Sequence, residues 1–299
     1  MSNEIQTAGR ARNGAVSIAY EVFGPATGEP MLLLMGTGMQ MLVWNEDFCN
    51  DLVRDGFQVI RMDNRDVGLS THLADAGEPG MFDMILRPKA AASYSLADMA
   101  ADAVAVLDDM SWDAAHIVGG SLGGMIAQTM AIEFPRRVRS LTSIMSSPSA
   151  RIGRATIRNS MRVAGLLQQP VHSAAEAADQ MIAMYRMIGT PAENYPLDIE
   201  WLREVGAESF RRAYDPAGKL RQQVALLAAP DRTKALGAVR VPTLVMHGTA
   251  DVMIRPEGGR ATANAVPGAK LVLLPGVGHG AFPRAVWPTM IDNIRAIAH

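Results

Sequence analysis

The stretch His116-Ile117-Val118-Gly119-Gly120-Ser121-Leu122-Gly123-Gly124 decides the fold. Its first residues are apolar and predict a short buried strand over 116–119, and the next residues predict a helix from Leu122 to Phe134. Ser121 therefore lies in a tight turn between a strand and a helix. Because glycine has no Cβ, Gly119 and Gly123 allow the strand and the helix to approach each other closely. Such a turn exposes a serine hydroxyl at the edge of a sheet.

Segments of strand and helix character alternate on both sides of this turn. Further strands are predicted over 15–23, 30–35, 58–62, 138–145, 241–247 and 270–274, and further helices over 96–110, 257–265 and 287–298. Strands that alternate with helices through short connections form mostly parallel sheets with helices on both faces. The sequence therefore predicts an α/β fold with a doubly wound sheet.

The alternation stops between about 147 and 235, where Met- and Ala-rich helical segments carry Pro and Gly and no strand is predicted. We expect a helical cap over residues 147–235, inserted into an α/β core formed by residues 1–146 and 236–299. Met181, Met184 and Ile188 lie at helical spacing in this cap. Ordinary packing explains them, and they would also suit an adaptable apolar pocket over Ser121.

Composition and charge limit the partners. Hydrophobic residues make up 48% of the 299 residues, which is ample material for a buried core, and the net charge of −2 favours neither nucleic acid nor an acidic membrane. We expect no signal peptide and no membrane span. Cys49 is the one cysteine, so the chain fits a reducing, cytoplasmic compartment. No cofactor or metal motif is recognised, and the oligomeric state stays open.

The sequence contains one local group of basic residues. Arg151, Arg154, Arg158 and Arg162 are spaced as residues on one stripe of a helix. We interpret them as a solvated face rather than as a binding surface.

A serine hydroxyl needs a histidine to take its proton and a carboxylate to orient that histidine. Of the six histidines, His279 lies in the loop after the last predicted strand, where a doubly wound sheet gathers its ligands. Asp251 follows the strand 241–247 and emerges at the same edge. The order Ser121, Asp251, His279 is the one that hydrolases with this serine turn use. We expect these residues to form a catalytic triad.

Each of the three also has a structural interpretation. Ser121 would then cap the helix, His279 would be a loop residue without chemistry, and Asp251 would stabilise an Asx-turn.

Negative charge on an attacked carbonyl oxygen needs two backbone N–H donors. The Leu122 amide at the start of the helix should supply one. The loop after the strand 30–35 reads Met35-Gly36-Thr37-Gly38, and we expect the Thr37 amide to supply the other. A purely structural glycine turn is the alternative for this loop.

Three motifs in this order, GGSLGG at 119–124, HGTAD at 247–251 and GVGHG at 276–280, resemble those of the α/β-hydrolase fold superfamily. The stretch 63–70 is similar to a loop that these enzymes carry beside the active site, and we interpret it as a salt-bridged turn. The chain looks most like methylesterases of the aclacinomycin type and related carboxylesterases. Met35 stands where many relatives have histidine, which bears on the position of the Thr37 amide.

The resemblance implies a serine hydrolase that cleaves small carboxylic esters through an acyl-enzyme and needs no cofactor. A serine at 121 argues against haloalkane dehalogenases and epoxide hydrolases, which place aspartate there. Two alternatives stay open. The triad would act on a lactone, an amide or a carbon-carbon bond or form peracids, or the fold would serve a non-catalytic small-molecule receptor.

Overall fold

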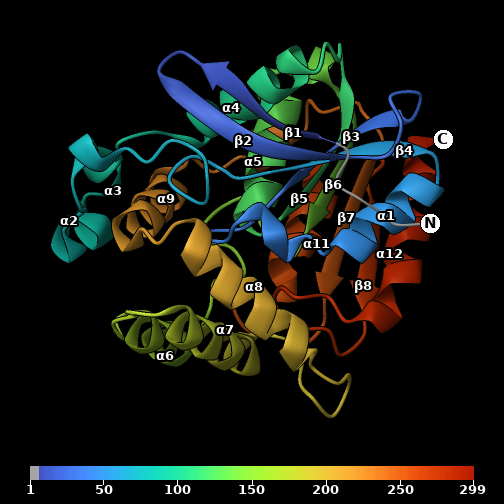
Figure 1. The fold of residues 1–299 in the computed structure, drawn as a ribbon. Coiled ribbons are helices and arrows are strands. Elements are labelled where there is room, and N and C mark those ends of the chain that lie inside the picture. The colour runs from blue at the N-terminus through green and yellow to red at the C-terminus, as the bar shows by residue number, and fades with distance from the viewer. Residues whose placement is uncertain (1–6) are drawn as a thin grey trace.

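A computed structural model describes residues 7–299 and contains an eight-stranded sheet in the order β1-β2-β4-β3-β5-β6-β7-β8 (Figure 1). The strands are β1 (Thr7–Asn13), β2 (Val16–Phe23), β3 (Glu29–Leu34), β4 (Phe57–Met62), β5 (Ala115–Gly120), β6 (Val138–Ile144), β7 (Thr243–Gly248) and β8 (Lys270–Leu274). Strand β2 pairs antiparallel with β1 and β4, and the remaining neighbours pair in parallel. The prediction of a mostly parallel α/β sheet is confirmed.

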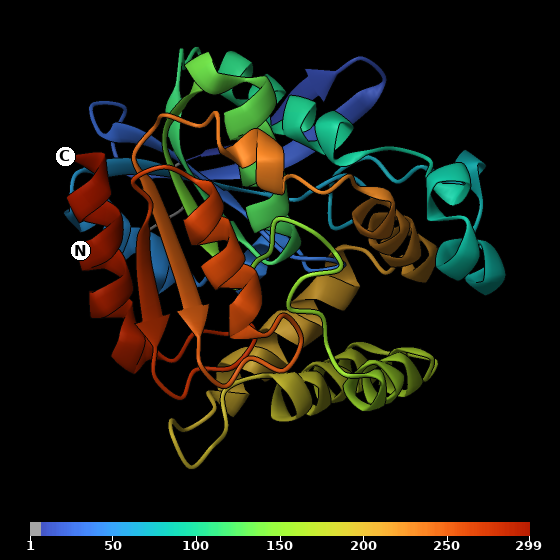
Figure 2. The same cartoon turned by 180° about the vertical axis from the view of Figure 1, so that it is seen from behind.

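Helices cover both faces of the sheet. The helices of the described residues are α1 (Glu46–Arg54), α2 (Met81–Leu86), α3 (Pro88–Ala91), α4 (Leu96–Asp109), α5 (Leu122–Glu133), α6 (Ile157–Leu167), α7 (Ala174–Ile188), α8 (Ile199–Arg212), α9 (Pro216–Ala228), α10 (Thr233–Leu236), α11 (Pro256–Ala265) and α12 (Trp287–Ala298). Figures 1 and 2 show α1 and α12 on one face and α4, α5 and α11 on the other. Within residues 7–299, no helix combines the length and the apolar character needed to cross a membrane.

The central strands are buried on both faces, as the parallel arrangement requires. In β3, Met31 and Leu33 pack with α1 and α12, whereas Leu32 and Leu34 pack with α4 and α5. Successive side chains of a strand point to opposite faces, so one apolar run supplies both cores. This explains why these strands appear in the sequence as continuous apolar segments.

The sequence pattern does not predict β1 or α1. Strand β1 is an edge strand with the sequence TAGRARN, and among its residues only Ala11 is buried. Its antiparallel pairing with β2 holds it in the sheet, although apolar and polar residues do not alternate along it. Helix α1 begins at an Asn45 cap, whose side chain accepts a hydrogen bond from the Asp47 amide at 2.8 Å.

Helices α6 to α9 fall between β6 and β7 in the chain, and Figure 2 shows α6 to α8 beyond the carboxyl ends of β7 and β8. Helix α6 begins at Ile157, so Arg151 and Arg154 precede it. The prediction of one helical stripe of four arginines is therefore wrong, because the chain turns irregularly before α6. All four arginines are exposed, as a solvated face requires.

Buried ion pairs tie these helices to the stretch 63–70. Arg212 at the end of α8 pairs with Asp63 at 2.8 Å, and Arg221 of α9 pairs with Asp66 at 2.7 Å. Within the core, Arg65 also pairs with Asp102 at 2.6 Å. The interpretation of this stretch as a salt-bridged turn is confirmed.

The turn at Ser121 is as tight as the sequence predicts. Ser121 has a φ of 56°, in the region that non-glycine residues rarely adopt. A Cβ on Gly119 would lie 2.1 Å from the Gly123 carbonyl oxygen, and one on Gly123 would lie 2.2 Å from the Leu34 carbonyl oxygen. Glycine is therefore needed at both positions, because the backbones themselves are in contact.

Gly119→Ala and Gly120→Ala form a matched pair. We expect Gly119→Ala to lower the free energy of unfolding by about 3 kcal/mol or more, because rigid backbone must move. A Cβ on Gly120 would meet nothing closer than Met145 Cε at 3.4 Å. Gly120→Ala should therefore cost less than about 1 kcal/mol. Urea unfolding measures both, and equal losses would contradict this account of the turn.

Candidate active site

Ser121 lies at the carboxyl end of β5 and at the start of α5. Its amide donates to the Ile144 carbonyl oxygen at 2.9 Å, and the Ser146 hydroxyl donates to its carbonyl oxygen at 2.8 Å. These bonds hold the strained backbone. The Ser121 side chain makes no capping hydrogen bond to α5, so its interpretation as a helix cap is wrong, and its hydroxyl is available to another partner.

The structure brings the three predicted residues together in one hydrogen-bonded line. His279 Nε2 lies 3.1 Å from Ser121 Oγ, and His279 Nδ1 lies 2.8 Å from Asp251 Oδ2. An ionised carboxylate only accepts, so Nδ1 carries the proton and donates it to Asp251. The lone pair of Nε2 is then free to accept the Ser121 hydroxyl. In this arrangement the imidazole is oriented so that its Nε2 can take the proton of the Ser121 hydroxyl.

The end of α7 holds the loop that carries His279. The His279 amide donates to the Ile188 carbonyl oxygen at 2.8 Å, and the Gly278 amide donates to Thr190 Oγ1 at 3.1 Å. A Cβ on Gly278 would lie 2.0 Å from the Gly189 carbonyl oxygen, so the two segments are in backbone contact. The position of the imidazole therefore depends on the inserted helices as well as on the sheet.

Asp251 has both of the roles that the sequence allows. Its Oδ1 accepts hydrogen bonds from the Met253 and Ile254 amides, both at 2.9 Å, which closes an Asx-type turn, while Oδ2 accepts from His279. His247 orders the same loop, because its Nε2 lies 2.6 Å from the Ile254 carbonyl oxygen and 3.4 Å from Asp251 Oδ2.

The environment of Asp251 keeps it ionised. Burial raises the pKa of this carboxyl group, but the charges and hydrogen bonds of His279 and His247 outweigh burial and lower the pKa to about 2. Asp251 is therefore a carboxylate throughout the neutral range, as an orienting acid must be.

The two predicted N–H donors lie beside Ser121. Leu122 is the first residue of α5, whose first amides have no partner within the helix. A Cβ on Gly36 would lie 3.1 Å from Ser121 Cβ, so the loop that contains Thr37 passes directly over the serine. Within residues 7–299, the Thr37 amide has no hydrogen-bond acceptor. Both amides are available to a ligand oxygen.

Gln222 of α9 holds this loop and is not among the site residues predicted from the sequence. Its Oε1 accepts from the Gly38 amide at 2.7 Å, and its Nε2 donates to the Arg65 carbonyl oxygen at 2.6 Å. The side chain is fully buried. Gln222 has no motif around it, and a glutamine inside a helix gives no signal that it will meet a loop far away in the sequence.

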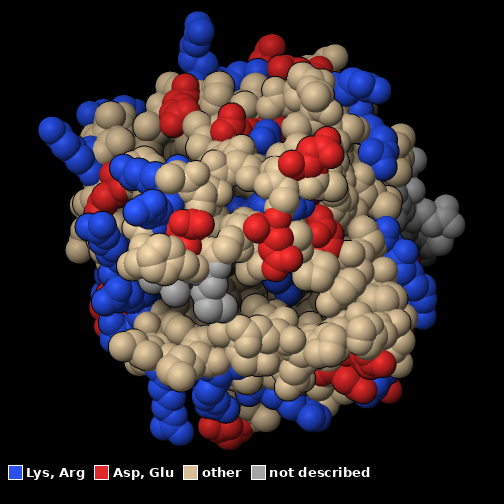
Figure 3. Space-filling model, turned by 90° about the vertical axis from the view of Figure 1, so that its left-hand side faces the viewer, with Lys and Arg blue, Asp and Glu red and all other residues tan. Residues whose placement is uncertain are grey.

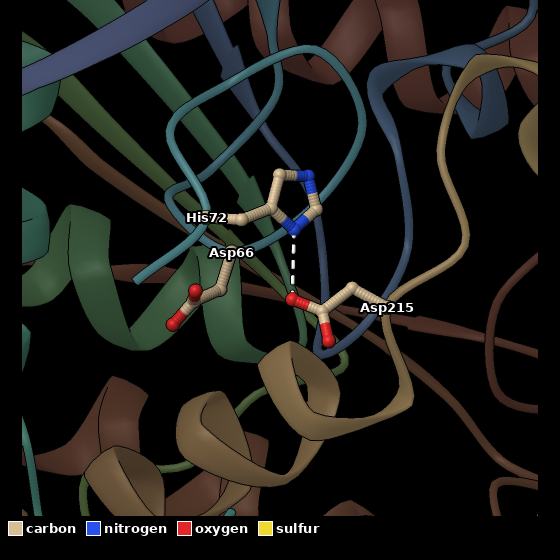
Figure 4. A group of neighbouring side chains, drawn as sticks. All are labelled: Asp66, His72 and Asp215. Atoms are coloured by element: carbon tan, nitrogen blue, oxygen red, sulfur yellow. Dashed lines mark hydrogen bonds and ion pairs between the residues drawn. The ribbon is translucent and has the colours of Figure 1, made fainter. Parts of the chain in front are cut away.

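One cluster within the described residues has the spacing of metal ligands, namely Asp66, His72 and Asp215 (Figure 4). Arg221 already donates to both carboxylates, at 2.7 Å to Asp66 and 3.0 Å to Asp215. His72 faces two acceptors, Asp215 Oδ2 at 2.8 Å and the Gly68 carbonyl oxygen at 2.9 Å.

The imidazole of His72 must be doubly protonated to satisfy both acceptors. Burial lowers its pKa, but the bonds to Gly68 and Asp215 and the charge of Asp215 outweigh burial and raise the pKa. A cationic imidazole does not bind a metal. The cluster is therefore an ion-pair network that joins α9 to the stretch 63–73.

A cavity of about 280 Å³ lies between the core and the inserted helices. It is bounded by the segments 43–48, 190–202 and 281–287, the last of which follows His279. Six of its seventeen lining residues are aromatic, namely Trp44, Phe48, Tyr195, Trp201, Phe282 and Trp287. Trp44 also approaches the serine turn, because a Cβ on Gly120 would lie 3.8 Å from its ring.

Known proteins share this architecture. Residues 29–285 match the family described as alpha/beta hydrolase fold. The chain is 30% identical over 300 residues to rhodomycin D methylesterase of Streptomyces peucetius, covering 92% of both proteins. It is 28% identical over 296 residues to a rhodomycin D methylesterase of Streptomyces sp. (strain C5), covering 91% of both. The solved enol-lactonase from Burkholderia xenovorans has a TM-score of 0.74 at 20% identity, covering 97% of this chain and 99% of that one.

The depressed pKa of Asp251 predicts a pH-dependent stability. An unfolded aspartate has a pKa of about 3.9, so the stabilisation from Asp251 is complete above that value and is lost as the pH falls toward about 2. Relative to Asp251→Asn, the free energy of unfolding of the wild-type protein should drop by about 1 kcal/mol between pH 6 and pH 3. Urea unfolding at both pH values measures this difference, and a constant difference would contradict it.

Proposed function

The chain belongs to the alpha/beta hydrolase fold family, and on that premise we propose that it is a serine hydrolase that cleaves carboxylic esters of small molecules. The observation that carries this proposal is the line of hydrogen bonds from Asp251 through His279 to Ser121. The two methylesterase relatives support an ester as the bond that is cleaved, because this chain aligns with about nine tenths of the length of each of them.

The proposed mechanism starts with the attack of Ser121 Oγ on the ester carbonyl carbon. His279 Nε2 takes the hydroxyl proton, and the Leu122 and Thr37 amides donate to the oxygen on which negative charge develops. The tetrahedral intermediate collapses as His279 returns the proton to the leaving alcohol, which forms an acyl-Ser121 ester. Water then attacks this ester with His279 as the base, and the carboxylic acid leaves.

Asp251 acts through His279. Its carboxylate fixes the tautomer with the proton on Nδ1 and stabilises the imidazolium that forms after proton transfer. The Met253 and Ile254 amides keep the carboxylate in place. Asp251 therefore positions the base and stabilises its charged form, and it does not accept the proton itself.

We assign the aromatic cavity to an apolar part of the substrate. The cavity adjoins the segment that follows His279 on one side and Trp44 on the other, and the segment 190–198 and the start of α8 supply part of its lining. On this assignment the segment 147–235 is a cap over an α/β core formed by 1–146 and 236–299. We also place the protein in the cytoplasm, without nucleic acid or membrane as a partner. A lactone is the second candidate substrate, because the fold is shared with an enol-lactonase.

Ser121→Ala tests the nucleophile. Because serine and histidine act as a unit, we expect kcat/KM for a p-nitrophenyl ester to fall by at least about a thousandfold. Ser160→Ala, at an exposed position of α6, is the control and should keep full activity. Wild-type protein should also be labelled by a fluorophosphonate, and Ser121→Ala should not. Activity of Ser121→Ala within tenfold of the wild type would rule out the mechanism, and labelling without turnover would favour a receptor.

Gln222→Met tests the support of the Thr37 loop. Methionine has a similar length but bonds neither the Gly38 amide nor the Arg65 carbonyl oxygen, so the Thr37 amide should move away from the developing charge. We expect kcat to fall by about ten- to a hundredfold while KM changes less than threefold.

The neighbouring Gln223 is half-buried on the same helix, and its side chain forms no hydrogen bond within the described residues. Gln223→Met should therefore keep kcat. An equal loss in both variants, or a loss confined to KM, would show that Gln222 does not position the loop for the transition state.

A further inference from the structure

Lys219 lies against the loop that carries Thr37. In the first turn of α9, its side chain packs on Gly38, where a Cβ would lie 2.3 Å from Lys219 Cε and 2.6 Å from Lys219 Cγ. Gly36 of the same loop is in contact with Ser121, because a Cβ there would lie 3.1 Å from Ser121 Cβ. The Lys219 stem therefore packs on the same short loop that contacts Ser121.

No acidic partner holds this ammonium group among residues 7–299. The carboxylates that join α8 and α9 to the stretch 63–73 are each paired with other groups: Asp63 with Arg212, Asp66 with Arg221, and Asp215 with His72 and Arg221. Lys219 forms no ion pair and no side-chain hydrogen bond within the described residues. The network therefore balances its own charges and leaves the charge of Lys219 uncompensated.

Lys219 differs from the other lysines in its surroundings. The chain has four lysines, and Lys89, Lys234 and Lys270 are exposed, whereas Lys219 is half-buried. Burial lowers the pKa of Lys219 to about 8. Figure 3 shows that the side of the molecule on which α9 lies is hollowed, with acidic side chains near the edge of the hollow.

A second cation beside the same loop, Arg212, also has a hydrogen-bond donor without a partner within the described residues. Arg212 Nη2 binds Asp63, but Arg212 Nη1 is buried and has no hydrogen-bond partner within the described residues. Asp63 in turn accepts from the Met41 amide at 2.7 Å, at the end of the Thr37 loop. Asp63 compensates the charge of Arg212, whereas Lys219 has no counter-ion within the described residues. A partly buried charge without a counter-ion is costly in free energy, and an anion bound at Lys219 would lower that cost.

We propose that Lys219 binds a carboxylate that the substrate carries in addition to its scissile ester, so that the enzyme selects monoanionic esters. One ammonium group balances one carboxylate, and its place beside the Thr37 loop puts the anion next to the reacting ester. This inference rests on the proposed function and specifies its substrate class. Lys219 is then a residue that determines specificity, while Ser121, His279 and Asp251 carry the reaction.

The test compares matched pairs of esters. In one pair the carboxylate is on the acyl side, mono-p-nitrophenyl adipate against p-nitrophenyl hexanoate. In the other it is on the alcohol side, 4-(hexanoyloxy)benzoate against phenyl hexanoate. For each pair the ratio of kcat/KM, anionic over neutral, is measured at pH 7 after subtraction of the rate without enzyme. Wild-type protein should favour the anionic ester in at least one pair.

Lys219→Met keeps an unbranched stem on Gly38 and removes the charge. A charged hydrogen bond contributes about 1.5–3 kcal/mol, so the favoured ratio should fall at least about tenfold in this variant. Lys219→Arg should retain most of the preference, whereas Lys234→Met, at an exposed position of α10, should leave the ratio unchanged. In the wild type the ratio should fall as the pH rises past about 8, where the ammonium loses its proton, and Lys219→Met should lack this fall.

The possible failures are distinct. Hydrolysis of neither ester by the wild type would overturn the proposed function itself. Hydrolysis of both with no anionic preference in either pair, or a preference that Lys219→Met retains, would overturn the role of Lys219 and leave the serine mechanism intact. An equal loss on anionic and neutral esters would likewise overturn it, because it would mean that Lys219 supports the Thr37 loop rather than a substrate anion.

Discussion

The close backbone contact between β5 and α5 at Ser121 is the constraint on which the rest of the site depends. Gly119 of β5 lies against the Gly123 carbonyl oxygen of α5, and Gly123 lies against the Leu34 carbonyl oxygen of β3. Ser121, between the two glycines, has a φ of 56°. In that conformation the Ser121 side chain points away from the helix and is exposed at the carboxyl edge of the sheet. The same turn begins α5 at Leu122, the residue after the serine. One local geometry therefore supplies both the nucleophile and one of the oxyanion donors that we propose.

The remaining chemistry reaches Ser121 from three parts of the chain that the sheet and the inserted helices hold together. The loops after β7 and β8 bring Asp251 and His279 to the same edge. Ile188 at the end of α7 and Thr190 just beyond it accept hydrogen bonds from two amides of the His279 loop, and α9 holds the Thr37 loop through Gln222. The inserted helices thus do more than cover the site, because they bear on both the base and the proposed oxyanion donors. Their own attachment rests on buried ion pairs to the stretch 63–70.

Much of this architecture is predictable from sequence because it follows local rules. The buried parallel strands are apolar runs, and the glycines around Ser121, the carboxylate of Asp251 and the imidazole of His279 each follow a strand end. Strand β1 is not predictable in this way, since an edge strand with polar residues on both faces has no apolar period. Gln222 and Lys219 are also beyond such rules, because their partners are fixed by how α9 packs. The arginine stripe fails for a similar reason, as helical spacing alone does not show where a helix begins.

The account depends on a covalent bond between substrate and Ser121. The most direct measurement is rapid acid quenching during turnover of p-nitrophenyl hexanoate, followed by proteolysis and mass spectrometry of the peptide that contains residue 121. The account predicts a hexanoyl adduct on the Ser121 oxygen, formed at the rate of the p-nitrophenol burst and lost at the steady-state rate. Turnover with no acyl adduct, or with the adduct on another side chain, would contradict it.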